Sequence, residues 1–309
     1  MQLGRQGGRI VVMDEPRRRW VVVRDADDLP SLLGREDWRG LVERSLADGV
    51  LGEAPDGLPF APQSLRAFAL WEAHMVNGAR GMVRRFAPPA LRRLAGAYER
   101  ATGRVLPPLR PKSNYRKYPQ FYVGNHRSLV PDGATVRWPA FSGVLDFELE
   151  IGVVIGRPVR DCTAEEGRRA IAGLCIVNDW SARDTQWDDT RNGTFGGVVK
   201  AKTFAGAMSA VVVSADEILP RWQSLRGRAA VNGEVWCEGA TAGPTFDLGE
   251  AVAYAAMGET LLPGDLLSTG TLPGCCGLEI GRFIAPGDTV RLEIDGLGSL
   301  TNTVSQRGA

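Results

Sequence analysis

The sequence predicts an α+β fold that is mostly β, built on a mixed sheet that folds back on itself. From about residue 121 onward, short β-like runs alternate with turn signals such as Asp-Gly, Asn-Gly and Pro-Gly-Asp. Few helical stretches interrupt these runs, so alternating βαβ units are not expected. The remaining helical patterns all precede residue 104.

Residues 1–62 are expected to form a smaller N-terminal region. Within it, residues 9–24 have the pattern of two short strands around a Glu-Pro turn, and residues 40–48 that of a short helix. A Gly- and Pro-rich linker at 52–63 ends the region.

Residues 63–104 are expected to form a helical segment. Apolar residues recur at helical spacing over 64–86, with Ser64 as a suitable N-cap. Residues 88–103 predict a second helix, because Pro lies at its start and Gly at its end.

Residues 105–309 form the β-rich remainder, which opens with a Pro-rich connection at 106–120. Helices are predicted at 163–172, with Thr163 as N-cap, and at 248–258. The predicted strands lie in the runs "FYVG", "ATVRWP", "LDFELEIGVVIG", "GLCIVNDW", "AMSAVVVSADEI", "GRAAVNGEVW", "GDLLSTGT" and "GDTVRLEIDGLGSLTNTV".

Composition excludes several classes of partner. A net charge of +1 gives no reason to expect nucleic acid or an anionic membrane. No secretory signal and no apolar run of membrane-spanning length is present, so we expect a cytoplasmic protein. Five Cys without a C-x-x-C pair fit reduced thiols in that compartment.

The run "LDFELEIGVVIG" (145–156) carries acids at a spacing of two. On a strand, Asp146, Glu148 and Glu150 line one face, with apolar residues on the other. Unpaired buried carboxylates are costly, so a divalent cation or a network of arginines must compensate them. Arginines at 157, 160 and 183 are near enough in sequence to supply such a network.

Asp179 adds a further carboxylate, because it follows the apolar strand "LCIV" at the point where the chain leaves the sheet. Glu148, Glu150 and Asp179 together offer three hard oxygen ligands that suit Mg²⁺, Mn²⁺ or Ca²⁺. Zinc is less suited, since the chain has two His and no Cys cluster. Spacing alone leaves the metal and the arginine network both open.

Several blocks in order resemble the fumarylacetoacetate hydrolase family over roughly residues 120–305. They are "LDFELEIGVVIG", "VNDWSARDTQ", "KTF", "VNGEVW", "PGDLLSTGTLPG" and "PGDTVRLEIDGLGSLTNTV". The resemblance implies a mixed β-sheet roll as the catalytic domain, a helical lid over 63–104, and a homodimer. It also implies that Glu148, Glu150 and Asp179 hold Mg²⁺ or Ca²⁺, with Asp146 at the family's usual acidic position before the Glu pair.

Hydrolases of that family use a His–Glu pair to activate water, and two His compete for this role. His74 resembles the His of the family's lid helix and is favoured as the base, oriented by Glu279 or Glu72. His126 lies in "FYVGNHRSL", which resembles a later block in which a Tyr, here Tyr122, contacts substrate.

Four more residues match functional positions of the family. Lys202, one of few Lys in the chain, can stabilise an oxyanion or enolate. Arg183 and Gln186 match positions that hold substrate or order water, although an ion pair with Asp184 or Asp188 would equally explain the arginine. Thr271 matches a substrate-binding threonine.

Three positions depart from the pattern of the longer hydrolases of the family. Ala67 stands where they carry a fourth acidic metal ligand, Ala69 replaces a Tyr, and Gly206 replaces a Thr. Shorter members manage with three carboxylates, so metal binding is still expected, but the substrate pocket is expected to differ.

The leading functional hypothesis is a metal-dependent hydrolase that cleaves a C–C bond in a small 1,3-dioxo acid of the acylpyruvate type through an enolate. One alternative is a decarboxylase, tautomerase or hydratase that acts on a 2-oxo acid at the same site. Another is a catalytically degenerate paralogue that binds a metal or ligand, which the departures at Ala67, Ala69 and Gly206 would explain.

Overall fold

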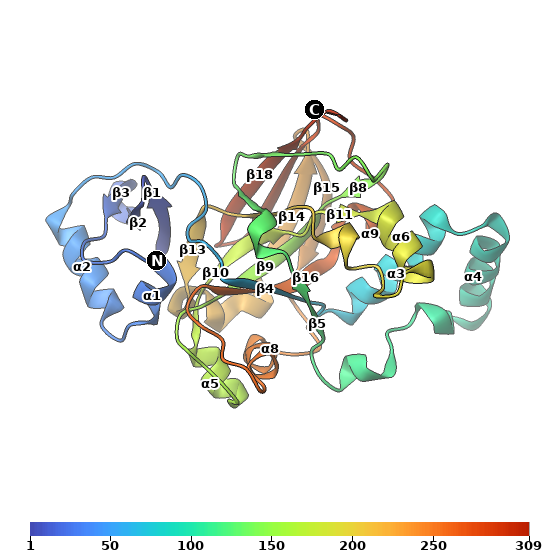
Figure 1. Cartoon of the computed structure of the whole chain (residues 1–309), viewed down its shortest axis with the longest axis horizontal. Coiled ribbons are helices and arrows are strands. Elements are labelled where there is room, and N and C mark those ends of the chain that lie inside the picture. Colours follow the sequence, from blue (N-terminus) through green and yellow to red (C-terminus); the bar gives the residue numbers. More distant parts are fainter. Residues whose placement is uncertain (309) are drawn as a thin grey trace.

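The computed structural model describes residues 1–308 and centres on a mixed sheet of eleven strands (Figure 1). The order β3-β2-β1-β13-β10-β9-β16-β4-β5 is an open path, and β12 joins β6 to β10. The strands are β1 Gln2–Gln6, β2 Arg9–Asp14, β3 Arg19–Val22, β4 Ser64–Phe68, β5 Phe121–Gly124, β6 Leu129–Pro131, β9 Glu148–Ile155, β10 Ile171–Asn178, β12 Gly206–Met208, β13 Val211–Ser214 and β16 Asp265–Cys276.

A five-stranded sheet, in the order β15-β14-β17-β18-β7, packs against the large one. Its strands are β7 Thr135–Val136, β14 Arg226–Val231, β15 Glu234–Ala240, β17 Thr289–Ile294 and β18 Gly298–Val304; β8 Leu145–Asp146 and β11 Ser181–Ala182 form a separate pair. Phe147, Leu149 and Ile151 bury their side chains in the same core as Leu292 and Leu300. The acid-bearing strand therefore turns its apolar face to the core, and the predicted α+β fold is confirmed.

The helices gather in separate groups around the sheets. Figure 1 shows α1 and α2 beside the N-terminal strands, and α3, α4 and α6 at the opposite side of the molecule. The helices are α1 Leu29–Gly34, α2 Trp38–Asp48, α3 Glu72–Phe86, α4 Pro89–Thr102, α5 Ala164–Arg169, α6 Arg183–Asn192, α7 Ala215–Ile218, α8 Leu248–Ala255 and α9 Gly277–Ile280. Within residues 1–308, none of them is long and apolar enough to cross a membrane.

Most predicted elements are present, with shifted ends. The two N-terminal strands and the helix predicted at 88–103 are confirmed, and Thr163 caps α5 through a capping box with Glu166. β1 was not predicted; it pairs with β13 and so ties the N-terminal hairpin to the large sheet. Residues 215–218 are helical, although the sequence pattern predicted strand there.

The helix predicted over 64–86 is wrong in its first third. Residues Ser64–Phe68 form β4, which pairs in parallel with β16 and antiparallel with β5. The helix begins only at Glu72, so Ser64 is not its N-cap. Phe68, Leu70 and Trp71 are buried almost continuously, as expected for a strand covered on both faces and the segment that follows it.

Helix α3 lies very close to the short helix α9, and Gly81 makes this approach possible. A Cβ atom at Gly81 would lie 2.3 Å from the carbonyl oxygen of Leu278. Beside it, Arg84 donates hydrogen bonds to the carbonyls of Leu278 and Glu279, at 3.0 and 2.8 Å. Helix α3 is therefore held against the turn that carries Glu279.

We predict that Gly81→Ala lowers the free energy of unfolding by about 1–3 kcal/mol, because the added methyl group must push α3 away from α9. Gly78→Ala is the matched control on the same helix, since its Cβ would meet only His74 Cε1 at 3.9 Å. That control is expected to gain about 0.5–1 kcal/mol from helix propensity. Urea denaturation of both variants measures the difference, and equal stabilities would contradict the account.

Candidate active site

A pocket of about 410 Å³ opens beside α3, at the end of the acid-bearing strands. It collects residues from β4, α3, β5, β9, α6 and β16, which lie far apart in the sequence. The predicted site residues that line it are His74, Tyr122, Glu148, Glu150, Asp179, Arg183, Gln186, Lys202 and Thr271. Glu279 lies directly behind His74, so of the predicted set only Glu72 is elsewhere.

Three carboxylates meet at one point of this pocket. Glu148 and Glu150 come from the same face of β9, and Asp179 follows the last residue of the neighbouring β10. One oxygen from each carboxylate lies within 4.8 Å of the others, which is close enough for all three to contact one ion. The period-two spacing on the strand therefore produces the expected cluster.

Two buried cations hold this cluster together. Lys202 forms ion pairs with Glu148 and, at 2.8 Å, with Asp179 Oδ2. Arg183 bridges Asp146 Oδ2 and Glu148 Oε1, at 2.8 and 2.7 Å. Burial opposes the charged form of Glu148, but Lys202 and Arg183 outweigh it and hold the pKa of Glu148 below its usual range.

Glu150 has no such cationic partner among the described residues. It accepts hydrogen bonds from the hydroxyls of Ser268 and, at 3.4 Å, of Thr271. Burial, with the charges of Asp179 and Glu148 beside it, raises the pKa of Glu150 well above its usual value. Burial likewise raises the pKa of Asp179.

The donor set fits a divalent cation. Four buried carboxylates, those of Asp146, Glu148, Glu150 and Asp179, face the two cations Arg183 and Lys202, which leaves a formal excess of two negative charges. An ion of charge +2 would neutralise this excess, and carboxylate oxygens are the ligands that Mg²⁺, Mn²⁺ and Ca²⁺ prefer. Glu148, Glu150 and Asp179 could hold it.

Asp146 has a different task, which sequence reasoning did not identify. Its carboxylate accepts hydrogen bonds from the backbone N–H groups of Gly277 and Leu278, at 2.8 and 2.9 Å, and from Arg183 Nε at 2.8 Å. It therefore fixes the start of α9, which carries Glu279, and the guanidinium of Arg183. The sequence signals for Asp146 are its place on the acid face of the strand and its match to the family's usual acidic position before the Glu pair.

His74 and Glu279 form a hydrogen-bonded pair at the edge of the pocket. His74 Nδ1 lies 2.7 Å from Glu279 Oε1, and the other ring nitrogen, Nε2, lies 4.0 Å from Glu148 Oε1. The second oxygen of Glu279 accepts the backbone N–H of Gly274 at 3.0 Å. A proton on Nδ1 shared with Glu279 leaves Nε2 as an acceptor that faces the carboxylate cluster.

Glu72 does not orient His74. It forms a two-pronged ion pair with Arg116, at 2.9 and 2.7 Å, whereas Glu279 is hydrogen-bonded to the imidazole. His126 lies in the turn His126–Ser128 after β5 and does not line the pocket. The structure thus places His74, and not His126, beside the carboxylate cluster.

Tyr122, Arg183 and Gln186 also line the pocket, and each has a hydrogen-bond partner there. The hydroxyl of Tyr122 donates to Asp179 Oδ2 at 2.6 Å, and burial raises the pKa of this phenol well above its usual value. Arg183 donates to Gln186 Oε1 at 2.9 Å. Its ion-pair partners are Asp146 and Glu148, so the alternative of a pair with Asp184 or Asp188 is wrong.

Ala67 and Ala69, two of the departures, both line the pocket with small side chains. Ala67 lies opposite Tyr122 in the β4–β5 pairing. At Gly206, a Cβ would meet Leu129 Cδ2 at 2.9 Å, so a threonine could enter only if Leu129 moved.

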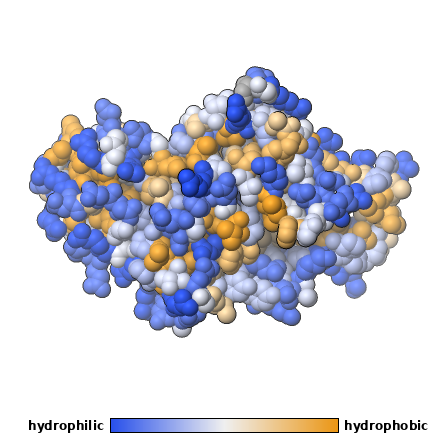
Figure 2. Space-filling model, viewed as in Figure 1, coloured by the Kyte–Doolittle hydropathy of each residue, from blue (hydrophilic) through white to orange (hydrophobic). Residues whose placement is uncertain are grey.

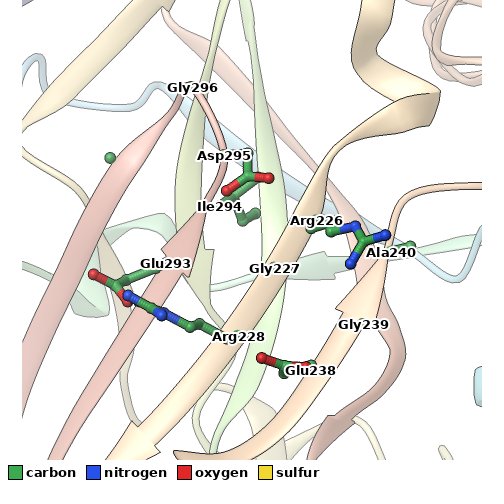
Figure 3. A pocket seen from close by; sticks show the side chains of 11 residues that line it. Arg226, Gly227, Arg228, Glu238, Gly239, Ala240, Glu293, Ile294, Asp295 and Gly296 are labelled. Atoms are coloured by element: carbon green, nitrogen blue, oxygen red, sulfur yellow. The ribbon is translucent and has the colours of Figure 1, made fainter.

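A larger cavity, of about 700 Å³, lies over the five-stranded sheet, away from these residues (Figure 3). Its walls come from β14, β15 and β17, and Arg228 there forms an ion pair with Glu293. It has no histidine, cysteine or lysine in its lining. Size alone therefore does not mark the site, and the smaller pocket holds the reactive groups.

Comparisons with known proteins agree with this geometry. Residues 97–305 match the family model described as fumarylacetoacetate (FAA) hydrolase C-terminal. Protein Rv2993c of Mycobacterium tuberculosis is 34% identical over 193 residues, which are 62% of this chain and 68% of that protein.

Two solved structures share the fold across the whole chain. Fumarylacetoacetate hydrolase from Exiguobacterium antarcticum is 22% identical, with a TM-score of 0.70 over 99% of this chain and 98% of its own. A 5-carboxymethyl-2-hydroxymuconate delta-isomerase from Mycobacterium smegmatis is 22% identical, with a TM-score of 0.66 over 100% of both chains. With two thirds of its length matched by the family model, the chain belongs to the fumarylacetoacetate hydrolase family.

Proposed function

We propose that the pocket is the active site of a metal-dependent hydrolase that cleaves a C–C bond in a 1,3-dioxo acid of the acylpyruvate type. The observation that carries this proposal is the His74–Glu279 pair, whose free ring nitrogen faces the Glu148, Glu150 and Asp179 cluster. Enolate formation alone would need only the carboxylate cluster. A base held beside the cluster is suited to activate water, as hydrolysis requires.

Glu148, Glu150 and Asp179 would hold Mg²⁺, with Mn²⁺ or Ca²⁺ as substitutes. When bound, such a cation supplies a Lewis acid that polarises substrate oxygens and stabilises negative charge. Lys202 and Arg183 add fixed positive charge on the same side of the pocket. Tyr122 and Thr271 offer hydroxyl groups at the pocket wall for hydrogen bonds to the substrate.

His74 would remove a proton from water at Nε2 while Glu279 stabilises the imidazolium that forms. The water oxygen adds to the acyl carbonyl, and the bond from that carbon to the neighbouring methylene then breaks. The electron pair of the broken bond stays with the pyruvate fragment as its enolate, which takes up a proton. The products are a carboxylic acid and pyruvate, so atoms and charge balance.

A second candidate is decarboxylation, tautomerisation or hydration of a 2-oxo acid at the same carboxylate cluster. The specific observation in its favour is that Glu148, Glu150, Asp179 and Lys202 are assembled without help from His74. The isomerase from Mycobacterium smegmatis that shares the fold is consistent with such chemistry in the family.

We predict that His74→Asn lowers kcat for acylpyruvate hydrolysis by about 10²–10⁴-fold, because the general base is removed. Glu279→Gln should lower it by about 10–100-fold, since one hydrogen bond to a charged group is lost. The loss of the substrate's ultraviolet absorbance measures turnover. His126→Asn is the matched control and should keep full activity.

The His74→Asn variant also distinguishes the two candidate functions. If the protein is a decarboxylase that needs only the cation, His74→Asn would spare turnover of oxaloacetate. Full acylpyruvate hydrolysis by His74→Asn would contradict the proposed role of this base.

We also predict that Mg²⁺ stabilises the wild-type protein by about 2.7 kcal/mol at a concentration 100 times its Kd. Glu150→Gln should remove most of this response. The same variant should leave the metal-free protein as stable as the wild type or more so, because it removes a buried carboxyl group whose charged form has no ion-pair partner among the described residues.

Thermal unfolding with EDTA and with added Mg²⁺ measures both effects. Glu165→Gln is the control, because this exposed residue pairs with Arg169 on α5, outside the pocket lining, and should keep the full metal response. An undiminished Mg²⁺ response in Glu150→Gln would show that Glu150 is not a ligand.

A further inference from the structure

The pocket lining contains two chemically different groups of side chains. One group is titratable or charged: His74, Glu148, Glu150, Asp179, Arg183 and Lys202. A second group is small and apolar and is here called the apolar wall: Met75, Gly78, Ala79, Met82, Val198 and Leu278. An acyl chain that extends along α3 from a head group bound at the carboxylate cluster would contact this wall.

The apolar wall is largely one face of α3. Met75, Gly78, Ala79 and Met82 recur at positions i, i+3, i+4 and i+7, so they form a continuous stripe along the helix. Leu278 and Val198 extend this surface from α9 and from the loop after α6.

Helix α6 adds neutral polar groups to the pocket lining. Gln186 and Thr190 lie one turn apart and both line the pocket. Phe86 of α3 stacks on Trp187 of α6, with ring centroids 6.1 Å apart, and so joins the two helices beside the pocket. Figure 2 shows hydrophobic residues near the middle of this face of the molecule, and further ones toward its left and right ends, among hydrophilic residues.

Within the described residues, no cation is available at the apolar wall. The two cations that line the pocket, Arg183 and Lys202, are both paired with carboxylates of the cluster. On α3 itself, Arg80 donates to Glu99 of α4, and Arg84 donates to backbone carbonyls of α9. Arg85 lies over the rings of Phe86 and Phe283.

Other nearby cations are engaged outside the pocket lining. Arg116 pairs with Glu72 at the start of α3. Arg191 at the end of α6 lies over the Trp187 ring, and Lys200 lies over the Phe141 ring, each 5.2 Å from the ring centroid. A carboxylate placed against the apolar wall would therefore lose its hydration without gaining a counter-charge.

We propose that this enzyme acts on acylpyruvates whose acyl group is an uncharged aliphatic or aromatic chain, and that the apolar wall rejects substrates that end in a second carboxylate. This inference rests on the proposed function, because it takes the acylpyruvate head group as given. It adds a specificity determinant: Met82 and its neighbours on α3 offer no counter-charge, and so favour an uncharged acyl chain over one that ends in a carboxylate.

A matched pair of compounds tests it. Butanoylpyruvate and succinylpyruvate have the same chain length, and differ only in a methyl or a carboxylate at the end of the acyl group. Calorimetry with Mg²⁺-loaded His74→Asn measures binding of both without turnover. We expect butanoylpyruvate to bind on the order of 10–100-fold more tightly.

Turnover of both compounds by the wild-type enzyme is measured in parallel. This measurement separates the claim about the apolar wall from the proposed hydrolase function. If succinylpyruvate binds as tightly as butanoylpyruvate or more tightly, the inference on the apolar wall is overturned, whatever is hydrolysed. If butanoylpyruvate binds preferentially but neither compound is hydrolysed, the inference stands and the proposed hydrolase function fails.

A charge introduced at the wall should reverse the preference. Met82→Lys is expected to improve binding of succinylpyruvate relative to butanoylpyruvate by about tenfold or more, because it supplies the missing cation. Met82→Gln is the control, with a neutral polar chain of similar length, and should not favour the carboxylate. Ala79→Lys serves as a second variant. An unchanged ratio in both lysine variants would overturn the proposal.

Discussion

Buried negative charge on β9 is the constraint on which the rest of the site depends. Asp146, Glu148 and Glu150 cannot remain charged in this interior without partners, and Asp179 from the neighbouring strand adds to the demand. Arg183 and Lys202 compensate only part of the negative charge of these four carboxylates. In the proposed function, a divalent cation would neutralise the uncompensated remainder, so an arrangement that is costly without the ion would become favourable with it.

The same charge network also positions the proposed base. Asp146 joins Arg183 to the first backbone N–H groups of α9, and Glu279 lies on that helix. Gly81 allows α3 to approach α9 closely, which places His74 within hydrogen-bond distance of Glu279. The carboxylate cluster and the His–Glu pair are therefore linked through α9, and α3 carries both the proposed base and the apolar wall of the pocket.

Local sequence patterns could predict the parts of this site that depend on local geometry. The alternation of acids on one strand places Glu148 and Glu150 together, while the contact of His74 with Glu279 came from family resemblance. The prediction of Glu72 as an alternative partner of His74 is wrong, because residues two apart on a helix do not face each other. The strand at Ser64–Phe68 depends on pairing with β16, two hundred residues away, and such long-range pairing leaves no local signal in a short apolar run.

The most direct test of the central claim is a crystal structure of the protein with Mn²⁺ and oxalate, in which anomalous scattering locates the ion. The account predicts one ion held by Glu148, Glu150 and Asp179, with oxalate on its open side facing His74 Nε2. An ion bound elsewhere, with the Lys202 ammonium still paired to both Glu148 and Asp179 at an ion-free cluster, would contradict it.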